Sequence, residues 1–261
     1  MQEHMGYVQA IILSFVEGVT EFLPISSTGH LILASKLLNI PQSEFVKSFE
    51  ITIQLGAILA VVVLYFQTLV NSREIWKRVL VAFIPSGIIG FLLYRMVKMY
   101  LLGNANVVIA SLFLGGIAML ILEEFFGRKE KQKKSIENLS VIQSTTIGII
   151  QSIAMIPGVS RAMATIFGGL GVGLTRKSAV EFSFLLAVPT MLAATTLDLI
   201  KTNFLFTGKD YLLLSIGFVG AFISALITVK GLITFVQKHS FKLFAVYRII
   251  LALIFWWTAR R

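Results

Sequence analysis

The chain has 261 residues, of which 56% are hydrophobic and 14% charged, with a net charge of +10 and no cysteine. Soluble domains carry about 25% charged residues, so the composition excludes an ordinary water-facing surface and predicts one integral membrane domain over residues 1–261. The missing cysteines exclude disulfides and thiol nucleophiles. The basic residues cluster between apolar runs, and this distribution indicates a lipid bilayer as partner and no nucleic acid.

The first apolar segment, residues 7–38, is broken by the run Pro24-Ile25-Ser26-Ser27-Thr28-Gly29-His30. A second segment, residues 140–175, is broken by Pro157-Gly158-Val159-Ser160-Arg161. A helix facing lipid cannot leave backbone groups unpaired at such breaks. We therefore expect two re-entrant helical hairpins, each leaving the membrane on the side it entered.

Six further apolar runs predict an all-α protein with six transmembrane helices. They cover residues 48–70, 79–100, 106–126, 178–200, 211–229 and 243–258. The most basic loop, residues 128–134, should be cytoplasmic. Counting crossings from it places the other basic loops on the same side, opens the first hairpin outward and opens the second toward the cytoplasm.

Both halves contain a broken hairpin followed by crossing helices, one of which holds a proline, Pro85 or Pro189. Because the hairpins enter from opposite sides, we expect an inverted repeat of residues 1–126 and 138–261. Broken segments at matched positions point to a binding site. The alternative is that the prolines only kink helices, since the spacing from hairpin proline to helix proline differs between the halves.

Glu17 and Glu21 stack on one helix face at i, i+4 spacing in an apolar segment. Their mutual repulsion and desolvation are unfavourable unless something offsets them. A divalent cation, Mg²⁺ or Ca²⁺, would do so, because both prefer oxygen ligands. The alternative is a carboxylate pair at a hydrated interface without a metal.

A half-helix is predicted to begin near Ser26 or Ser27, where its N–H groups would bind an anion. Ser26, Thr28 and Gly29 are thus expected to bind substrate. His30 lies deep in an apolar region, and we expect it to be catalytic rather than structural. Ser27 either acts as a nucleophile or orients a water, with His30 as general acid or base.

We call the run at residues 24–30 the first break and the run at residues 157–161 the second break. The second break contains an arginine, Arg161, between apolar stretches. Its guanidinium fits phosphate bidentately, whereas the alternative is a structural ion pair with Glu17 or Glu21. Gly158 lets the backbone approach a ligand, and Ser160 and Thr165 add hydroxyl donors. Together the two breaks predict metal-assisted phosphoryl transfer.

These residues resemble the undecaprenyl-diphosphatase family, also called the bacitracin-resistance phosphatase family. The stretch from Glu17 to His30 resembles its glutamate-rich motif and serine–histidine segment. Residues 157–165 resemble its second motif, Pro-Gly-x-Ser-Arg-Ser-x-x-Thr, with Ala162 in place of the second serine. Residues 49–57 and 181–189 look familial too, so the resemblance covers nearly the whole chain.

The resemblance implies hydrolysis of undecaprenyl diphosphate to undecaprenyl phosphate, which recycles the lipid carrier for peptidoglycan and other cell-wall glycans and confers bacitracin resistance. It implies a divalent cation, a site on the outer face of the bacterial cytoplasmic membrane, and allows a homodimer. A missing hydroxyl at Ala162 puts the rate in doubt more than the activity.

Two other functions fit parts of the pattern. Inverted repeats with broken helices are typical of transporters, which favours a transporter or flippase of a phosphorylated polyprenyl lipid. An acid-phosphatase-like lipid phosphatase would need two catalytic histidines, and His239 lies in the wrong context for the second.

Overall fold

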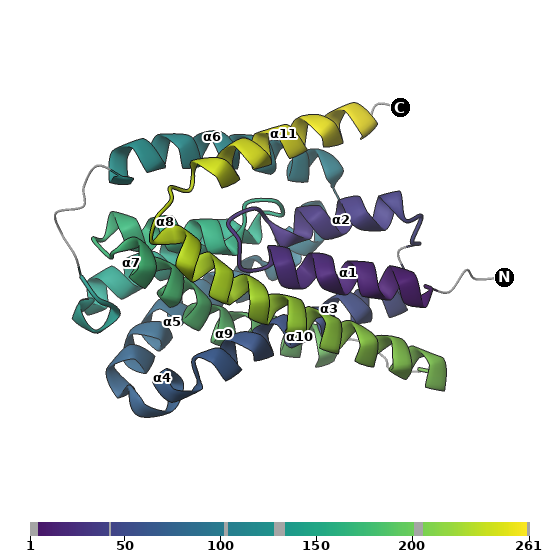
Figure 1. Cartoon of the computed structure of the whole chain (residues 1–261), viewed down its shortest axis with the longest axis horizontal. Helices are drawn as coiled ribbons and strands as arrows, with labels where there is room; N and C mark the ends of the chain where they lie inside the picture. The colour runs from purple at the N-terminus through teal and green to yellow at the C-terminus, as the bar shows by residue number, and fades with distance from the viewer. Residues whose placement is uncertain (1–4, 42, 102–103, 128–133, 201–205, 260–261) are drawn as a thin grey trace.

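The computed structural model describes residues 5–41, 43–101, 104–127, 134–200 and 206–259. Within these residues the regular structure consists of α-helices and two short 3-10 helices, with no strand (Figure 1). The all-α prediction is therefore confirmed for the described part of the chain. The most basic predicted loop, residues 128–134, falls outside it except for Lys134.

Five of the described helices are long and apolar enough to cross a membrane. They are α3 (Glu44–Leu64), α5 (Arg73–Tyr100), α6 (Ala105–Gly127), α9 (Arg176–Ile200) and α10 (Gly208–Val236). Large apolar side chains such as Phe91 and Leu92 on α5 are exposed, as expected where the surrounding solvent is lipid. The chain is thus a multi-pass membrane protein. The sixth predicted crossing coincides with α11 (Lys242–Ala259), which is not among these five.

The first two predicted crossings have different boundaries in the structure. The run 48–70 is divided at Tyr65 into α3 and the short helix α4 (Phe66–Asn71). The Trp76 indole donates a hydrogen bond to the Leu69 carbonyl, which holds α4 against α5. Helix α5 begins at Arg73 rather than at residue 79, because its polar first turns continue the helix beyond the apolar run.

Both broken segments form a helix, a turn and a second helix. The first comprises α1 (Tyr7–Thr20) and α2 (Ser27–Leu37). The second comprises α7 (Val141–Gln151), the 3-10 helix η2 (Ser152–Met155) and α8 (Arg161–Gly171). Ser26 and Ser160 are the N-caps of α2 and α8, with φ of 72° and 76°. Their side-chain oxygens accept hydrogen bonds from the third residue after each, so the two turns have the same local geometry.

The first helix of each broken segment packs tightly on a long helix of the other half: α1 on α10, and α7 on α5. The contacts are close because glycines lie in them. A Cβ at Gly18 would lie 2.0 Å from Ser224 Oγ, and one at Gly148 would lie 1.9 Å from the Ala82 carbonyl oxygen. Helices α6 and α11 also pair with each other, as do α3 and α9.

The two helix prolines do not occupy matching positions. Pro85 lies in α5, the second long helix after the first broken segment. Pro189 lies in α9, the first long helix after the second broken segment. The two prolines therefore lie in helices of different order within each half, which explains why the spacings from hairpin proline to helix proline differ.

Candidate active site

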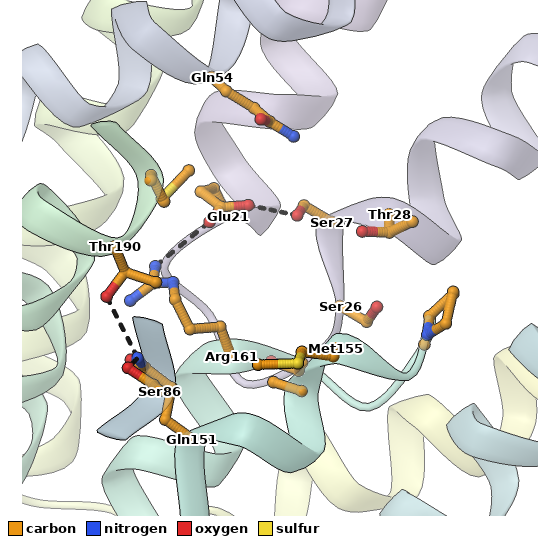
Figure 2. Close-up of a pocket in the computed structure, with 15 residues that line it drawn as sticks. Glu21, Ser26, Ser27, Thr28, Gln54, Ser86, Gln151, Met155, Arg161 and Thr190 are labelled. Carbon is orange, nitrogen blue, oxygen red and sulfur yellow. Dashed lines mark hydrogen bonds and ion pairs between the residues drawn. The ribbon is translucent and has the colours of Figure 1, made fainter. Parts of the chain in front are cut away.

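A cavity of about 220 Å³ lies where the two broken segments meet (Figure 2). It is smaller than the ~300–1,000 Å³ pockets of drug-sized ligands, so it suits a small polar head group. Its walls come from both breaks and from α3, α5 and α9. The lining residues are Glu21, Ser26, Ser27, Thr28, Gln54, Ser86, Gln151, Ala154, Met155, Pro157, Gly158, Ser160, Arg161, Thr190 and Met191.

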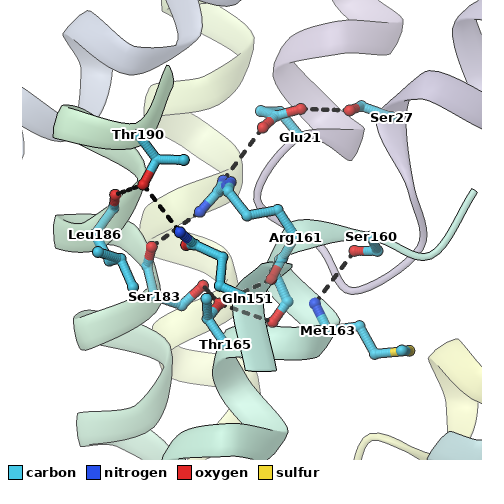
Figure 3. A network of polar contacts seen from close by, with 11 residues as sticks. Glu21, Ser27, Gln151, Ser160, Arg161, Met163, Thr165, Ser183, Leu186 and Thr190 are labelled. Carbon is cyan, nitrogen blue, oxygen red and sulfur yellow. Dashed lines mark hydrogen bonds and ion pairs between the residues drawn. The ribbon is translucent and has the colours of Figure 1, made fainter. Parts of the chain in front are cut away.

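Glu21 joins the two breaks at the cavity. One of its carboxylate oxygens accepts a hydrogen bond from the Ser27 hydroxyl. The other accepts from Arg161 Nη2 at 3.2 Å (Figure 3). All three residues line the cavity. The structure therefore brings together three predicted catalytic residues, and it contains the Arg161–Glu21 ion pair within the cavity wall.

Arg161 also contacts two residues that do not line the cavity. Its Nη1 donates to the Ser183 carbonyl on α9 at 2.9 Å, and its guanidinium lies over the Phe22 ring, 5.7 Å from the centroid. Its side chain is 11% exposed, and its Nε has no hydrogen-bond partner among the described residues. The bonds to Glu21 and Ser183 use two of the five guanidinium N–H groups, so Arg161 keeps donors for an anion in the cavity that it lines.

Thr165 was predicted to bind substrate, and the structure places it elsewhere. It is completely buried and does not line the cavity. Its Oγ1 lies 2.6 Å from Ser183 Oγ and 2.9 Å from the Arg161 carbonyl oxygen. Thr165 sits one helical turn after Arg161, so its hydroxyl ties α8 to α9 beneath the arginine instead of reaching the cavity.

Four other predicted binding residues line the cavity: Ser26, Thr28, Gly158 and Ser160. The two serines accept hydrogen bonds as N-caps, which leaves each hydroxyl proton free to be donated. Gly158 has a φ of +93°, and a Cβ there would lie 2.8 Å from the Val108 carbonyl oxygen, so only glycine fits. Gly29 faces Leu112 of α6 and does not line the cavity.

Glu17 lies one turn before Glu21 and is completely buried, outside the cavity lining. Neither of its carboxylate oxygens has a hydrogen-bond partner among the described residues. Within the same residues no group of three or more His, Asp and Glu side chains is gathered to hold a metal. An unpartnered buried carboxylate beside Glu21 nevertheless fits a divalent cation that takes its other ligands from a phosphorylated substrate.

His30 does not line the cavity. Its Nδ1 lies 2.7 Å from the Ser26 carbonyl oxygen, and its Nε2 lies 2.7 Å from the Tyr247 hydroxyl on α11. A carbonyl only accepts, so we assign the proton to Nδ1, and Nε2 then accepts from the tyrosine. Both nitrogens are engaged away from Ser27, so this placement does not support the prediction that His30 is the general acid or base.

Arg248 on α11 is a buried residue that the sequence analysis missed. It is 0% exposed. Its guanidinium donates to five backbone carbonyls at 2.8–3.5 Å, those of Pro24, Ser111, Leu112, Gly158 and Val159. It therefore fastens both breaks to α6. A single arginine inside an apolar run is a signal that could have revealed it.

Comparisons with known proteins identify the family to which the chain belongs. The family model described as bacitracin resistance protein BacA matches residues 10–254. The chain belongs to this family. It is 55% identical to the undecaprenyl-diphosphatase of Aquifex aeolicus, over 95% of this chain and 96% of the relative. It is also 51% identical to the protein of that name from Persephonella marina (96% and 98% covered) and 46% identical to the one from Thermus thermophilus (95% and 95% covered). The family resemblance predicted from the two motifs is confirmed.

Several cavity residues of this family member lie outside both motifs. Gln54 comes from α3, Ser86 from α5 and Thr190 from α9. Gln151, at the end of α7, was also missed. Each is a common residue in an apolar run, and only the packing of the helices brings it to the cavity.

Proposed function

We propose that this chain is a membrane phosphatase that hydrolyses undecaprenyl diphosphate to undecaprenyl phosphate and phosphate. The reaction recycles the lipid carrier for peptidoglycan and other cell-wall glycans, and by doing so confers bacitracin resistance. The observation that carries the proposal is a serine hydrogen-bonded to a carboxylate that an arginine also contacts, in a cavity between apolar helices. The name that the relatives share supports the substrate.

In the proposed reaction the Ser27 Oγ attacks the terminal phosphorus while Glu21 takes its proton. The new P–O bond forms as the bond to the bridging oxygen breaks, and undecaprenyl phosphate leaves. Glu21 gives the Ser27 proton to the leaving undecaprenyl phosphate and is thereby free to deprotonate a water molecule. This water attacks the phosphoserine, and Glu21 returns its proton to the Ser27 Oγ as phosphate leaves. Arg161 and the free N–H groups at the start of α2 stabilise the charge on the phosphoryl oxygens.

His30 has a positioning role in this mechanism. Its Nδ1 proton holds the Ser26 carbonyl, the residue directly before the nucleophile, and Tyr247 holds the ring from the other side. The hydrogen bonds fix the turn that presents Ser27. Glu21, which already contacts the Ser27 hydroxyl, is the better placed base.

Glu17 and Glu21 are the proposed ligands of a divalent cation, Mg²⁺ or Ca²⁺. When bound, the cation would neutralise part of the negative charge of the diphosphate. The unpartnered carboxylate of Glu17 supports this assignment. Without a cation or a proton, a buried carboxylate is strongly disfavoured in an apolar surrounding.

The proposal includes an arrangement in the bacterial cytoplasmic membrane. Six crossings surround two re-entrant hairpins, α1–α2 and α7–α8, which enter from opposite sides in an inverted repeat of residues 1–126 and 138–261. Two observations support the repeat. The N-cap turns of α2 and α8 match, and the first helix of each hairpin packs on a long helix of the other half, α1 on α10 and α7 on α5. The basic loops support an orientation in which the first hairpin and the cavity open outward.

A transporter or flippase is the second candidate, favoured by the paired broken helices. Phosphate release from undecaprenyl diphosphate by detergent-purified protein separates the two, because no sealed compartment exists in detergent. The phosphatase predicts release with Mg²⁺ or Ca²⁺ and its loss with EDTA. A folded wild-type protein that releases no phosphate with either cation would favour the transporter.

A further inference from the structure

Most polar groups in the cavity wall already have partners. Gln151 Nε2 donates to Ser86 Oγ at 2.8 Å and to Thr190 Oγ1 at 3.1 Å. The two hydroxyls donate in turn to carbonyls of their own helices, those of Phe83 at 2.9 Å and Leu186 at 2.7 Å. This wall braces α5, α7 and α9 together, and its hydrogen-bond donors are used within it.

Gln54 differs from these residues. It lines the cavity from α3, and its carboxamide has no hydrogen bond to any other residue that the structure describes. Figure 2 shows this carboxamide on the side of the cavity where Glu21 and Ser27 meet, opposite the Gln151 brace. An unpaired amide in a half-buried position retains two N–H donors for a ligand.

The rotation of α3 fixes this position. The neighbouring residues Ile53 and Ala57 are completely buried, and a Cβ at Gly56 would lie 2.3 Å from the Phe218 carbonyl oxygen on α10. Because α3 is seated so closely on α10, Gln54 is kept on the helix face toward the cavity. A donor held by a rigid helix needs little reorganisation during a reaction.

The chemistry of the neighbouring groups favours a neutral donor at this place. Attack on phosphorus spreads negative charge over the non-bridging oxygens. Arg161 supplies a positive charge from α8, already shared with Glu21. A carboxylate near Glu21 and Ser27 would repel the substrate, whereas a carboxamide donates a hydrogen bond without changing the charge of the site.

We propose that Gln54 is a further catalytic residue, whose Nε2 donates a hydrogen bond to a non-bridging oxygen of the phosphoryl group that Ser27 attacks. This inference rests on the proposed phosphatase function. It assigns to α3 a direct role in stabilising the transition state, beside the two broken segments.

The test compares Gln54→Met, which keeps the volume and removes the amide, with Gln67→Met, which makes the same change at an exposed site on α4. Phosphate release and inhibition by orthovanadate, which mimics the five-coordinate phosphorus, are measured on detergent-purified protein. Losing one hydrogen bond to a charged group should lower kcat and weaken vanadate inhibition by roughly 10- to 100-fold in Gln54→Met. Gln67→Met should match the wild type in both.

Gln54→Glu is a second variant, which keeps the shape of the side chain. It replaces Gln54→Met in the test if that variant folds poorly. It should lose more activity than Gln54→Met, because the added charge repels the phosphoryl oxygens. An active wild type together with unchanged kcat and unchanged vanadate inhibition in Gln54→Met or Gln54→Glu would overturn the role of Gln54. A wild type without phosphate release would instead contradict the proposed function itself.

Discussion

At the scale of single residues, the two adjacent serines of the first break have different tasks. Ser27 bonds the Glu21 carboxylate, whereas the Ser26 side chain caps α2. Ser27→Ala should therefore lower phosphate release by on the order of 10³-fold or more, as expected when a nucleophile is removed. Ser26→Ala should mainly lower the free energy of unfolding, by about 1 kcal/mol.

Steady-state phosphate release and thermal unfolding in detergent measure the two effects. A phosphoserine trapped by acid quenching in the wild type and missing in Ser27→Ala would support serine attack. Substantial activity in Ser27→Ala, with no trapped phosphoenzyme in the wild type, would show that water attacks directly.

The role of His30 is tested by a substitution that keeps only its Nδ1 donor. The side-chain amide of His30→Asn can still donate to the Ser26 carbonyl, but it cannot act as a base. If His30 positions the turn, His30→Asn should retain activity within about ten-fold of the wild type, while His30→Ala, which leaves the carbonyl unpaired, loses more. Equal and nearly complete inactivity of both folded variants in the same phosphate assay would restore His30 as an acid or base.

The sequence predicted the residues whose chemistry is concentrated in the two short motifs. Glu21, Ser27 and Arg161 stand out because charge and hydroxyls are rare in apolar segments, and the structure joins them. Side-chain direction is not contained in such a motif, which is why Thr165 and His30 were expected at the cavity and lie outside it. Partners more than 200 residues away, such as Tyr247 for His30, depend on the fold.

At the scale of elements, α11 locks the two breaks together through Arg248. Arg248→Met would leave five carbonyls of α6 and the two turns without their donor. We expect a loss of about 3–5 kcal/mol in the free energy of unfolding, the range for removing one partner of a buried charged interaction. Arg248→Lys, with three donors at most, should recover part of it.

Thermal unfolding in detergent measures this loss, and Arg95→Met at an exposed position of α5 is the matched control. Equal melting temperatures for Arg248→Met and Arg95→Met would contradict the locking role of α11.

Helix existence was predictable because each long helix coincides with an apolar run. The ends of the helices were less predictable. The polar first turns of α5 and the division at Tyr65 follow from capping and packing rather than from hydropathy. The turns at Ser26 and Ser160 were located by their prolines and hydroxyls, but their shared positive φ was visible only in the structure.

At the scale of the whole molecule, the proposed orientation makes a prediction that the cysteine-free chain makes easy to test. Asn71 lies beside the basic stretch at the start of α5, and Asn104 lies between α5 and α6; both are exposed. In intact cells a membrane-impermeant thiol reagent should label Asn104→Cys and leave Asn71→Cys unlabelled until the membrane is permeabilised. The reverse pattern would invert the orientation and the side to which the cavity opens.

The pairing of the halves was only partly predictable from the sequence. The broken segments at residues 7–38 and 140–175 indicated a repeat, and the prolines Pro85 and Pro189 suggested a match that the helix order does not support. Glycine contacts, at Gly18 and Gly148, connect α1 with α10 and α7 with α5. Such contacts between distant segments are invisible in a single sequence, although they decide where the cavity forms.

The central claim is that Arg161 and Glu21, which form an ion pair where the two breaks meet, belong to the site of phosphoryl transfer. The chain offers a matched comparison, because Arg176 forms a second pair with buried Glu123, at 2.6 Å, away from the cavity. The most direct measurement is phosphate release from undecaprenyl diphosphate, with Mg²⁺ or Ca²⁺, by purified Arg161→Ala and Arg176→Ala.

Arg161→Ala should lose roughly 10²- to 10³-fold in kcat, as expected for removing a donor that stabilises the transition state. Arg176→Ala should unfold at a lower temperature and keep the turnover of its folded fraction. Wild-type turnover in Arg161→Ala, or equal losses of turnover in the two folded variants, would contradict the account.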